Sequence, residues 1–115
     1  MILYGIPNCD SVRKARKFLE KNQIDYQFHD FKKEGLSLPL IQIWLTLQPI
    51  EKLVNKRSTT WKQLSDTQKE QLMSQENLAL LTKYPTLIKR PVLQTNANTI
   101  LIGFKEAEYI SLISR

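Results

Sequence analysis

The only cysteine of the chain, Cys9, lies where a short apolar run gives way to a helical pattern. The run from Ile2 to Tyr4 ends at Gly5, and the helical pattern begins directly after Cys9. The start of a helix presents unpaired backbone N–H groups and a partial positive charge, and both stabilise a thiolate. We therefore expect Cys9 to have a lowered pKa and to act as a nucleophile, rather than as a small buried apolar residue.

The residues that follow Cys9 extend this prediction. Arg13 lies one helical turn further on and can add positive charge beside the thiol, whereas Asp10 partly opposes it unless it caps the helix. Position 12 is Val12, so the two-cysteine redox motif is absent. A mixed disulfide on Cys9 would then need an external thiol to resolve it, and glutathione is the obvious candidate.

Two other polar segments could take part in the chemistry. The stretch NKRSTT, residues 55–60, offers many hydrogen-bond donors before Trp61 and suits an anion site, although a basic surface loop would have the same composition. His29 is the only histidine and has no cluster of acidic residues around it, which argues against a metal site. The glycine patterns of nucleotide-binding loops are missing.

The elements that must position Cys9 follow from hydrophobic periodicity. Residues 2–4 read as a buried strand, and Asp10 or Ser11 can cap a helix that Asn22 ends. Residues 24–29 alternate between apolar and polar, as in a second strand. A strand, a helix and a strand joined by short links form a βαβ unit, so the two strands should be parallel.

The rest of the chain divides into a helical segment and a hairpin. Residues 37–84 show helical patterns with caps at Ser37 and at Ser65 or Asp66, and with a further helix starting at residue 76 or 77. Residues 92–95 and 99–104 read as antiparallel strands around an asparagine-rich turn. The last helix is predicted to place Phe104, Ala107, Ile110 and Ile113 on one face.

Together these elements predict one α/β domain with a mixed sheet in the order β-α-β, helical insert, β-β-α. This is the thioredoxin-like arrangement, with a core of about residues 1–36 and 86–115 and an all-helical insert of about residues 37–85. A proline at the position of Pro91 is commonly cis in such folds and lies beside the reactive thiol. Arg90 would then lie near Cys9 and could hold an anionic group.

Composition limits the class of protein. The 115 residues, 42% hydrophobic and 24% charged, fit a single globular domain. Neither a membrane span nor a signal peptide is recognisable, and one cysteine is typical of a reducing compartment, so we expect a cytoplasmic location. No large exposed apolar stripe is visible in the sequence, so we expect a monomer. The net charge of +6 permits anionic partners such as the two carboxylates of glutathione. The basic residues are spread along the chain, which argues against direct nucleic-acid binding.

Four segments carry a family resemblance: YGIPNCDSVRKARKFLE, YQFHDFKKEGL, NKRSTTWKQL and LIKRPVL. In this order they resemble the arsenate reductase-like (ArsC/Spx) family over essentially the whole chain, and most of all its monothiol YffB-type branch. The resemblance implies that Cys9 and Arg90 are catalytic and that Pro91 is the cis-proline. It also implies a glutathione- or substrate-binding set, which consists of Asn8, Arg13, Asn55, Arg57 and Pro91.

The resemblance leaves three functions open. The first is a glutathione-dependent thiol reductase without a tightly bound cofactor, with glutathione as co-substrate and a thiol, disulfide or oxyanion as substrate. The second is an Spx-like regulator that binds RNA polymerase. The third is an arsenate reductase, for which two anion-binding arginines of the family are missing: Asn55 stands at one position, with Arg57 two residues away, and Gly103 at the other.

Overall fold

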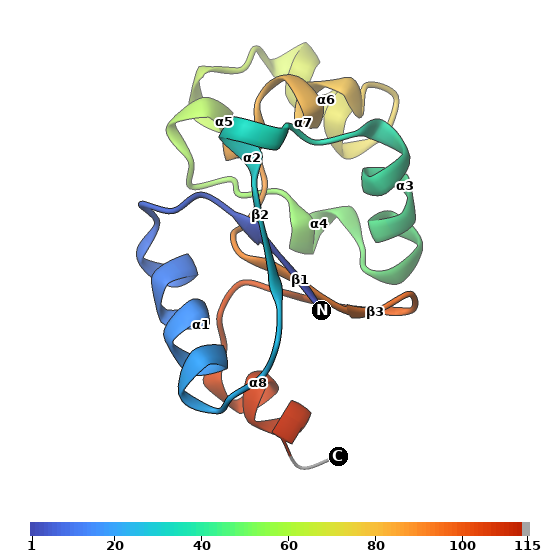
Figure 1. Cartoon of the computed structure of the whole chain (residues 1–115). Coiled ribbons are helices and arrows are strands. Elements are labelled where there is room, and N and C mark those ends of the chain that lie inside the picture. The colour runs from blue at the N-terminus through green and yellow to red at the C-terminus, as the bar shows by residue number, and fades with distance from the viewer. Residues whose placement is uncertain (114–115) are drawn as a thin grey trace. The chain divides into compact units, whose positions relative to one another are not determined.

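The computed structural model describes residues 1–113 and shows an α/β fold. Its four-stranded sheet contains both parallel and antiparallel pairs (Figure 1), in the order β2 (Gln27–Asp30), β1 (Ile2–Gly5), β3 (Val92–Asn96) and β4 (Thr99–Ile102). The chain folds as two compact units, one formed by Met1–Glu34 together with the C-terminal part from Arg90 onward, the other by Gly35–Lys89. The mixed sheet and the order of elements confirm the predicted thioredoxin-like α/β fold with a helical insert.

The first unit begins with the predicted βαβ arrangement. β1 (Ile2–Gly5) leads into α1 (Asp10–Lys21), and β2 (Gln27–Asp30) pairs with β1 in parallel. Asn22 ends α1 as expected. The second strand starts later than the alternating pattern suggested, because β1 begins at Ile2 and its partner in the register is Gln27. A one-turn helix, α2 (Phe31–Glu34), follows β2.

The hairpin of the first unit also forms as predicted. β3 (Val92–Asn96) runs antiparallel to β1 and to β4 (Thr99–Ile102), with a register shift near the turn. Gly103 then breaks the strand with φ +75°, and α8 (Glu106–Ile113) closes the unit.

One apolar core holds α1 and α8 against the sheet (Figure 1). The fully buried side chains of this cluster are Leu3 of β1, Leu93 of β3, Val12, Ala15 and Leu19 of α1, and Tyr109 of α8. The predicted buried face of the last helix is wrong, because Ala107 is exposed and Ile110 is 47% exposed. Tyr109 faces the core instead, where its ring packs against Phe18 and Phe104. The side chain of Ile113 lies outside the described part of the chain.

The second unit is built from short helices around its own core. Its elements are α3 (Leu38–Leu47), α4 (Ile50–Leu53), α5 (Thr59–Gln63), α6 (Asp66–Met73), α7 (Ala79–Lys83) and the 3₁₀ helix η1 (Pro85–Leu87). Ser37 caps α3, and Ser65 caps α6 with a complete capping box. α7 starts at Ala79, with Leu78 as its N-cap residue, and therefore later than the predicted start at residue 76 or 77.

Candidate functional site

Cys9 is the N-cap residue of α1. Its backbone is extended, with φ −97° and ψ 128°, and its carbonyl accepts the first helical hydrogen bond from the Arg13 N–H at 2.9 Å. The expectation that Asp10 or Ser11 caps the helix is therefore wrong, because both lie inside the first turn. An N-cap side chain points at the unpaired N–H groups of the first turn. The partly buried thiol thus occupies the position at which an anion is best stabilised.

The surroundings of Cys9 lower the pKa of its thiol. Burial acts in the opposite direction and is the largest single influence, but several groups favour the thiolate and together outweigh it. In decreasing order these are the backbone N–H of Val12, the Arg90 guanidinium through its hydrogen bond and its charge, and the backbone N–H of Ser11. The thiol is therefore poised to ionise more readily than an ordinary cysteine.

A close approach between β1 and α1 fixes the Val12 N–H. Gly5 ends β1, and a Cβ atom on it would lie only 2.7 Å from Cγ2 of Val12. Val12 itself is fully buried in the core of the first unit. The missing side chain at Gly5 therefore lets the first turn of α1 pack directly against the strand that leads to Cys9.

Arg90 is a second residue of the first unit that acts on the thiol, and it lies far from Cys9 in the sequence. It precedes β3, and the Arg90–Pro91 peptide bond is cis, as the resemblance implied. The Pro91 carbonyl accepts a hydrogen bond of 2.8 Å from the Gly103 N–H, which ties this segment to the end of β4. The fold thus brings a cation from residue 90 to a thiol at residue 9.

Other predicted residues lie elsewhere in the first unit. Arg13 forms an exposed ion pair with Asp10 at 2.7 Å and does not contribute to the lowered pKa of Cys9. Asn8 is exposed in the turn before the thiol. The roles of Asn8 and Arg13 in binding a substrate or glutathione stay predictions.

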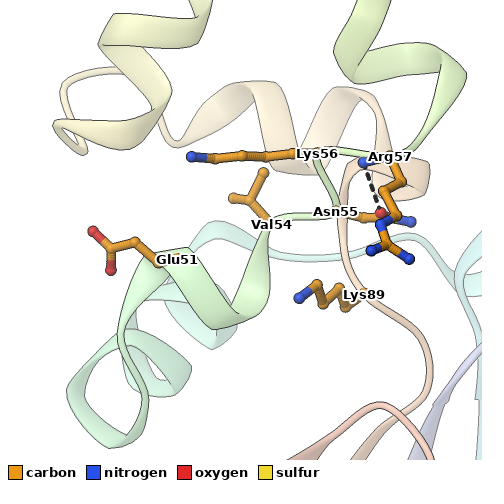
Figure 2. A pocket seen from close by; sticks show the side chains of 6 residues that line it. All are labelled: Glu51, Val54, Asn55, Lys56, Arg57 and Lys89. Atoms are coloured by element: carbon orange, nitrogen blue, oxygen red, sulfur yellow. Dashed lines mark hydrogen bonds between the residues drawn. The ribbon is translucent and has the colours of Figure 1, made fainter.

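Asn55 and Arg57 belong to the second unit, where they line a pocket of about 370 Å³ (Figure 2). Its other lining residues are Glu51, Val54, Lys56 and Lys89. The Asn55 Oδ1 atom accepts a hydrogen bond of 3.0 Å from the Arg57 N–H. The expected contribution of Asn55 and Arg57 to the chemistry of Cys9 stays a prediction.

Two contributors to the lowered pKa of Cys9 were not predicted, the backbone N–H groups of Val12 and Ser11. A helix start implies such donors in general without marking which of them acts. Lys89, which lines the pocket of the second unit, was not predicted either. No cluster of three His, Cys, Asp or Glu side chains able to hold a metal ion occurs among residues 1–113.

The family follows from comparison with known proteins. The ArsC family model matches residues 4–112. The chain belongs to the ArsC family. Helices of bilayer-spanning length and apolar character are absent from the described 113 residues.

Three relatives show how the chain compares within the family. A protein of uncharacterised function from Haemophilus influenzae is 43% identical over 107 residues, covering 93% of both chains. The global transcriptional regulator Spx of Lactiplantibacillus plantarum is 31% identical over all of this chain and 87% of its own length. The solved structure of a YffB protein superposes with a TM-score of 0.89 at 34% identity, covering 96% of each chain.

Proposed function

We propose that this ArsC-family protein is a glutathione-dependent thiol-disulfide reductase with Cys9 as its single nucleophile. The observation that carries the proposal is the place of the partly buried Cys9 thiol at the N-cap of α1, where the backbone N–H groups of Val12 and Ser11 and the Arg90 guanidinium lower its pKa. These groups favour the thiolate, which is the attacking form in disulfide exchange. Exposed cations on α1, among them Lys14 and Lys17, favour the approach of an anionic co-substrate such as glutathione.

The reaction proceeds in two exchanges. The Cys9 thiolate attacks a substrate disulfide R–S–S–R′, so that a Cys9–S–S–R′ bond forms and R–S⁻ leaves and takes a proton from water. The glutathione thiolate then attacks the R′ sulfur, which releases the Cys9 thiolate and forms R′–S–S–glutathione. Where R′ is itself glutathione, the product is glutathione disulfide. Each cycle consumes one substrate disulfide and one glutathione thiol and forms one substrate thiol and one new disulfide, so bonds and electrons balance without a further reductant.

Arg90 acts on both steps as a positioning cation. In the ground state it stabilises the Cys9 thiolate by a hydrogen bond and by its charge. In the second exchange Cys9 is the leaving group, and a leaving thiol with a lowered pKa departs faster. The same contact therefore accelerates the attack at neutral pH and the release of the enzyme thiol.

The test is turnover of a glutathionylated peptide with glutathione as the reductant. Wild type should release the peptide thiol catalytically, and Cys9→Ser should lose all turnover while it keeps the far-ultraviolet spectrum of the fold. Lys105→Gln is the matched control, because it removes an exposed cation of the first unit that belongs neither to the predicted binding set nor to the groups that lower the pKa of Cys9. Turnover that survives in Cys9→Ser would refute the proposal.

A second candidate is an Spx-like regulator that binds RNA polymerase, and one observation favours it. The Spx protein of Lactiplantibacillus plantarum aligns over the entire length of this chain. Such a role requires a binding surface and no turnover at Cys9. Stoichiometric binding of purified RNA polymerase subunits by wild type and Cys9→Ser alike would support this candidate, and the absence of binding would remove it.

Arsenate reduction receives less support from the site. Gly103, which stands where an arginine is expected in arsenate reductases, has φ +75°, a backbone conformation that an arginine rarely adopts. Asn55 uses its side-chain oxygen to accept the Arg57 N–H within its own loop. We therefore expect little or no arsenate turnover with glutathione and glutaredoxin.

A further inference from the structure

The helix that begins directly after the thiol, α1, is strongly cationic. Five of its twelve residues are Lys or Arg and two are Asp or Glu, so the helix has a net charge of +3 at neutral pH. The whole chain carries a net charge of +6, so this one helix supplies half of it. Positive charge is therefore concentrated beside Cys9.

Contacts within the first unit already occupy two of these cations and both carboxylates. Arg13 pairs with Asp10 at 2.7 Å. The Arg16 Nε atom donates a hydrogen bond of 3.1 Å to the Tyr26 hydroxyl. The Tyr26 hydroxyl in turn donates to the Glu20 Oε1 atom at 2.9 Å. Both acidic side chains of the helix thus have partners, and three lysines remain.

The three remaining lysines form one exposed row, which we call the lysine row: Lys14, Lys17 and Lys21. Among the residues that the structure describes, none of the three has an ion pair, a side-chain hydrogen bond or an aromatic contact. Their spacing of three and then four positions places them on one side of the helix. This side lies opposite the face of α1 that packs into the core of the first unit.

The lysine row leads away from the thiol along the helix axis. Because an α-helix rises 1.5 Å per residue, Lys14 lies about 7.5 Å and Lys21 about 18 Å beyond Cys9 along the axis. An extended peptide advances about 3.3 Å per residue. A peptide whose cysteine lies at Cys9 and which follows the helix would therefore pass the row with the residues about two to six positions from that cysteine.

The chemistry of the neighbouring thiol decides which anionic partner fits this row. A molecule that exchanges with Cys9 must bring a sulfur atom, which nucleic acids and phospholipid headgroups lack. The only aromatic residue of α1 is Phe18, and its ring packs against Tyr109, so the helix offers no stacking surface for bases. Separate ammonium groups are point charges that suit the separate carboxylates of an acidic polypeptide.

We propose that the substrates of this protein are glutathionylated protein segments with two or three Asp or Glu residues within about six positions of the modified cysteine. The carboxylates of the segment contact the lysine row while its mixed disulfide lies at Cys9. The Cys9 thiolate attacks the glutathione sulfur, so that a Cys9–S–S–glutathione bond forms, and the thiolate of the segment leaves and takes a proton from water. This inference rests on the proposed function and specifies its substrate class.

The test is the reduction by glutathione of three glutathionylated peptides that differ only in charge. They carry Glu, Gln or Lys at the second, fourth and sixth positions on either side of the cysteine. The kcat/KM for the Glu peptide should exceed that for the Gln peptide about tenfold at low salt, since three exposed ion pairs are each weak but act together. This ratio should fall toward one as the ionic strength rises, and the Lys peptide should be the slowest.

Variants of the lysine row test where the preference arises. Substituting Gln for all three of its residues should abolish the preference for the Glu peptide, and substituting Glu should reverse it in favour of the Lys peptide. The ratio between peptides is the readout, because every peptide uses the same glutathione step. The matched control substitutes Gln for Lys52, Lys62 and Lys105, which removes the same charge from exposed positions outside α1 and should leave the ratio unchanged.

Several results would overturn the inference. Equal kcat/KM for the Glu and Gln peptides would overturn it and leave the reductase standing, whereas no turnover of any peptide would overturn both. A preference that survives substitution of the lysine row, or that the control variant loses to the same extent, would assign it to the overall charge of the chain. Tighter binding of duplex DNA than of the Glu peptide by Cys9→Ser would give the row to nucleic acid.

Discussion

Replacing Gly5 by alanine perturbs the thiol site through a contact that can be traced atom by atom. A Cβ at position 5 meets Cγ2 of Val12 at 2.7 Å and Cγ1 at 3.4 Å, whereas apolar carbon atoms in contact lie about 3.5–4.0 Å apart. Val12 is fully buried and cannot turn into solvent. The first turn of α1 must therefore move away from β1, and with it the Val12 N–H that stabilises the Cys9 thiolate.

The expected free energies follow from this geometry. Overpacking of this kind destabilises a protein by about 1–3 kcal/mol. Val12→Ala removes two buried methyl groups and should cost about 2 kcal/mol, including the space left behind. In the double variant both clashing atoms are absent and the new methyl partly fills that space, while the Val12 Cβ remains at 3.6 Å, an ordinary contact. The double variant should therefore unfold with nearly the free energy of Val12→Ala alone.

The assay is urea unfolding of wild type, both single variants and the double variant, with the pKa of Cys9 measured in each by alkylation against pH. We expect a favourable coupling of about 1–3 kcal/mol between the two substitutions. The pKa of Cys9 should rise in Gly5→Ala and fall back toward the wild-type value in the double variant. Additive free energies, or an unchanged pKa in Gly5→Ala, would refute the claim that this close approach positions the N–H.

Three further predictions concern the thiol and the strand end. Arg90→Gln should raise the pKa of Cys9, whereas Arg13→Gln should leave it unchanged, and the alkylation rate against pH measures both. Equal effects of the two variants would contradict the conclusion that Arg90 and not Arg13 stabilises the thiolate. Because folding lowers the pKa of Cys9, its thiolate should stabilise the folded protein relative to Cys9→Ser. This difference in the free energy of unfolding should be complete above the unfolded-state pKa and should disappear as the pH falls through the folded-state pKa. Urea unfolding of both proteins at several pH values measures it. Gly103→Ala should cost about 1 kcal/mol because of its φ of +75°, with no clash to add to it, and an unchanged unfolding midpoint would contradict this.

The parts of the fold that sequence patterns predicted are those with local causes. The helix caps at Ser37 and Ser65 and the break at Gly103 depend on residues within one turn of the chain. The late start of β2 was missed because it is set by its partner strand, where Ile2 pairs with Gln27. The buried face of α8 was predicted wrongly from the spacing of Ala107 and Ile110. Tyr109 is the buried residue of this helix because its ring packs against aromatic neighbours such as Phe104.

The candidate site divides in the same way. Cys9 was found because a helix start is visible in sequence, and Arg90 because of its place before Pro91 in a recognised arrangement. The ion pair between Arg13 and Asp10 was not predicted, because the sequence does not show whether the exposed Arg13 side chain turns toward Asp10 or toward the thiol. Backbone donors such as the Val12 N–H have no residue-specific signal, and only folded geometry reveals them.

The pKa of Cys9 is the measurement that tests the central claim most directly. Alkylation rate against pH, followed by mass spectrometry after incubation with glutathione disulfide, reads the ionisation and the reactivity of the same sulfur. We predict half-ionisation of Cys9 at a pH below about 8.5, the usual pKa of a cysteine, and one glutathione attached at Cys9. Half-ionisation at or above that value, with no adduct, would contradict it.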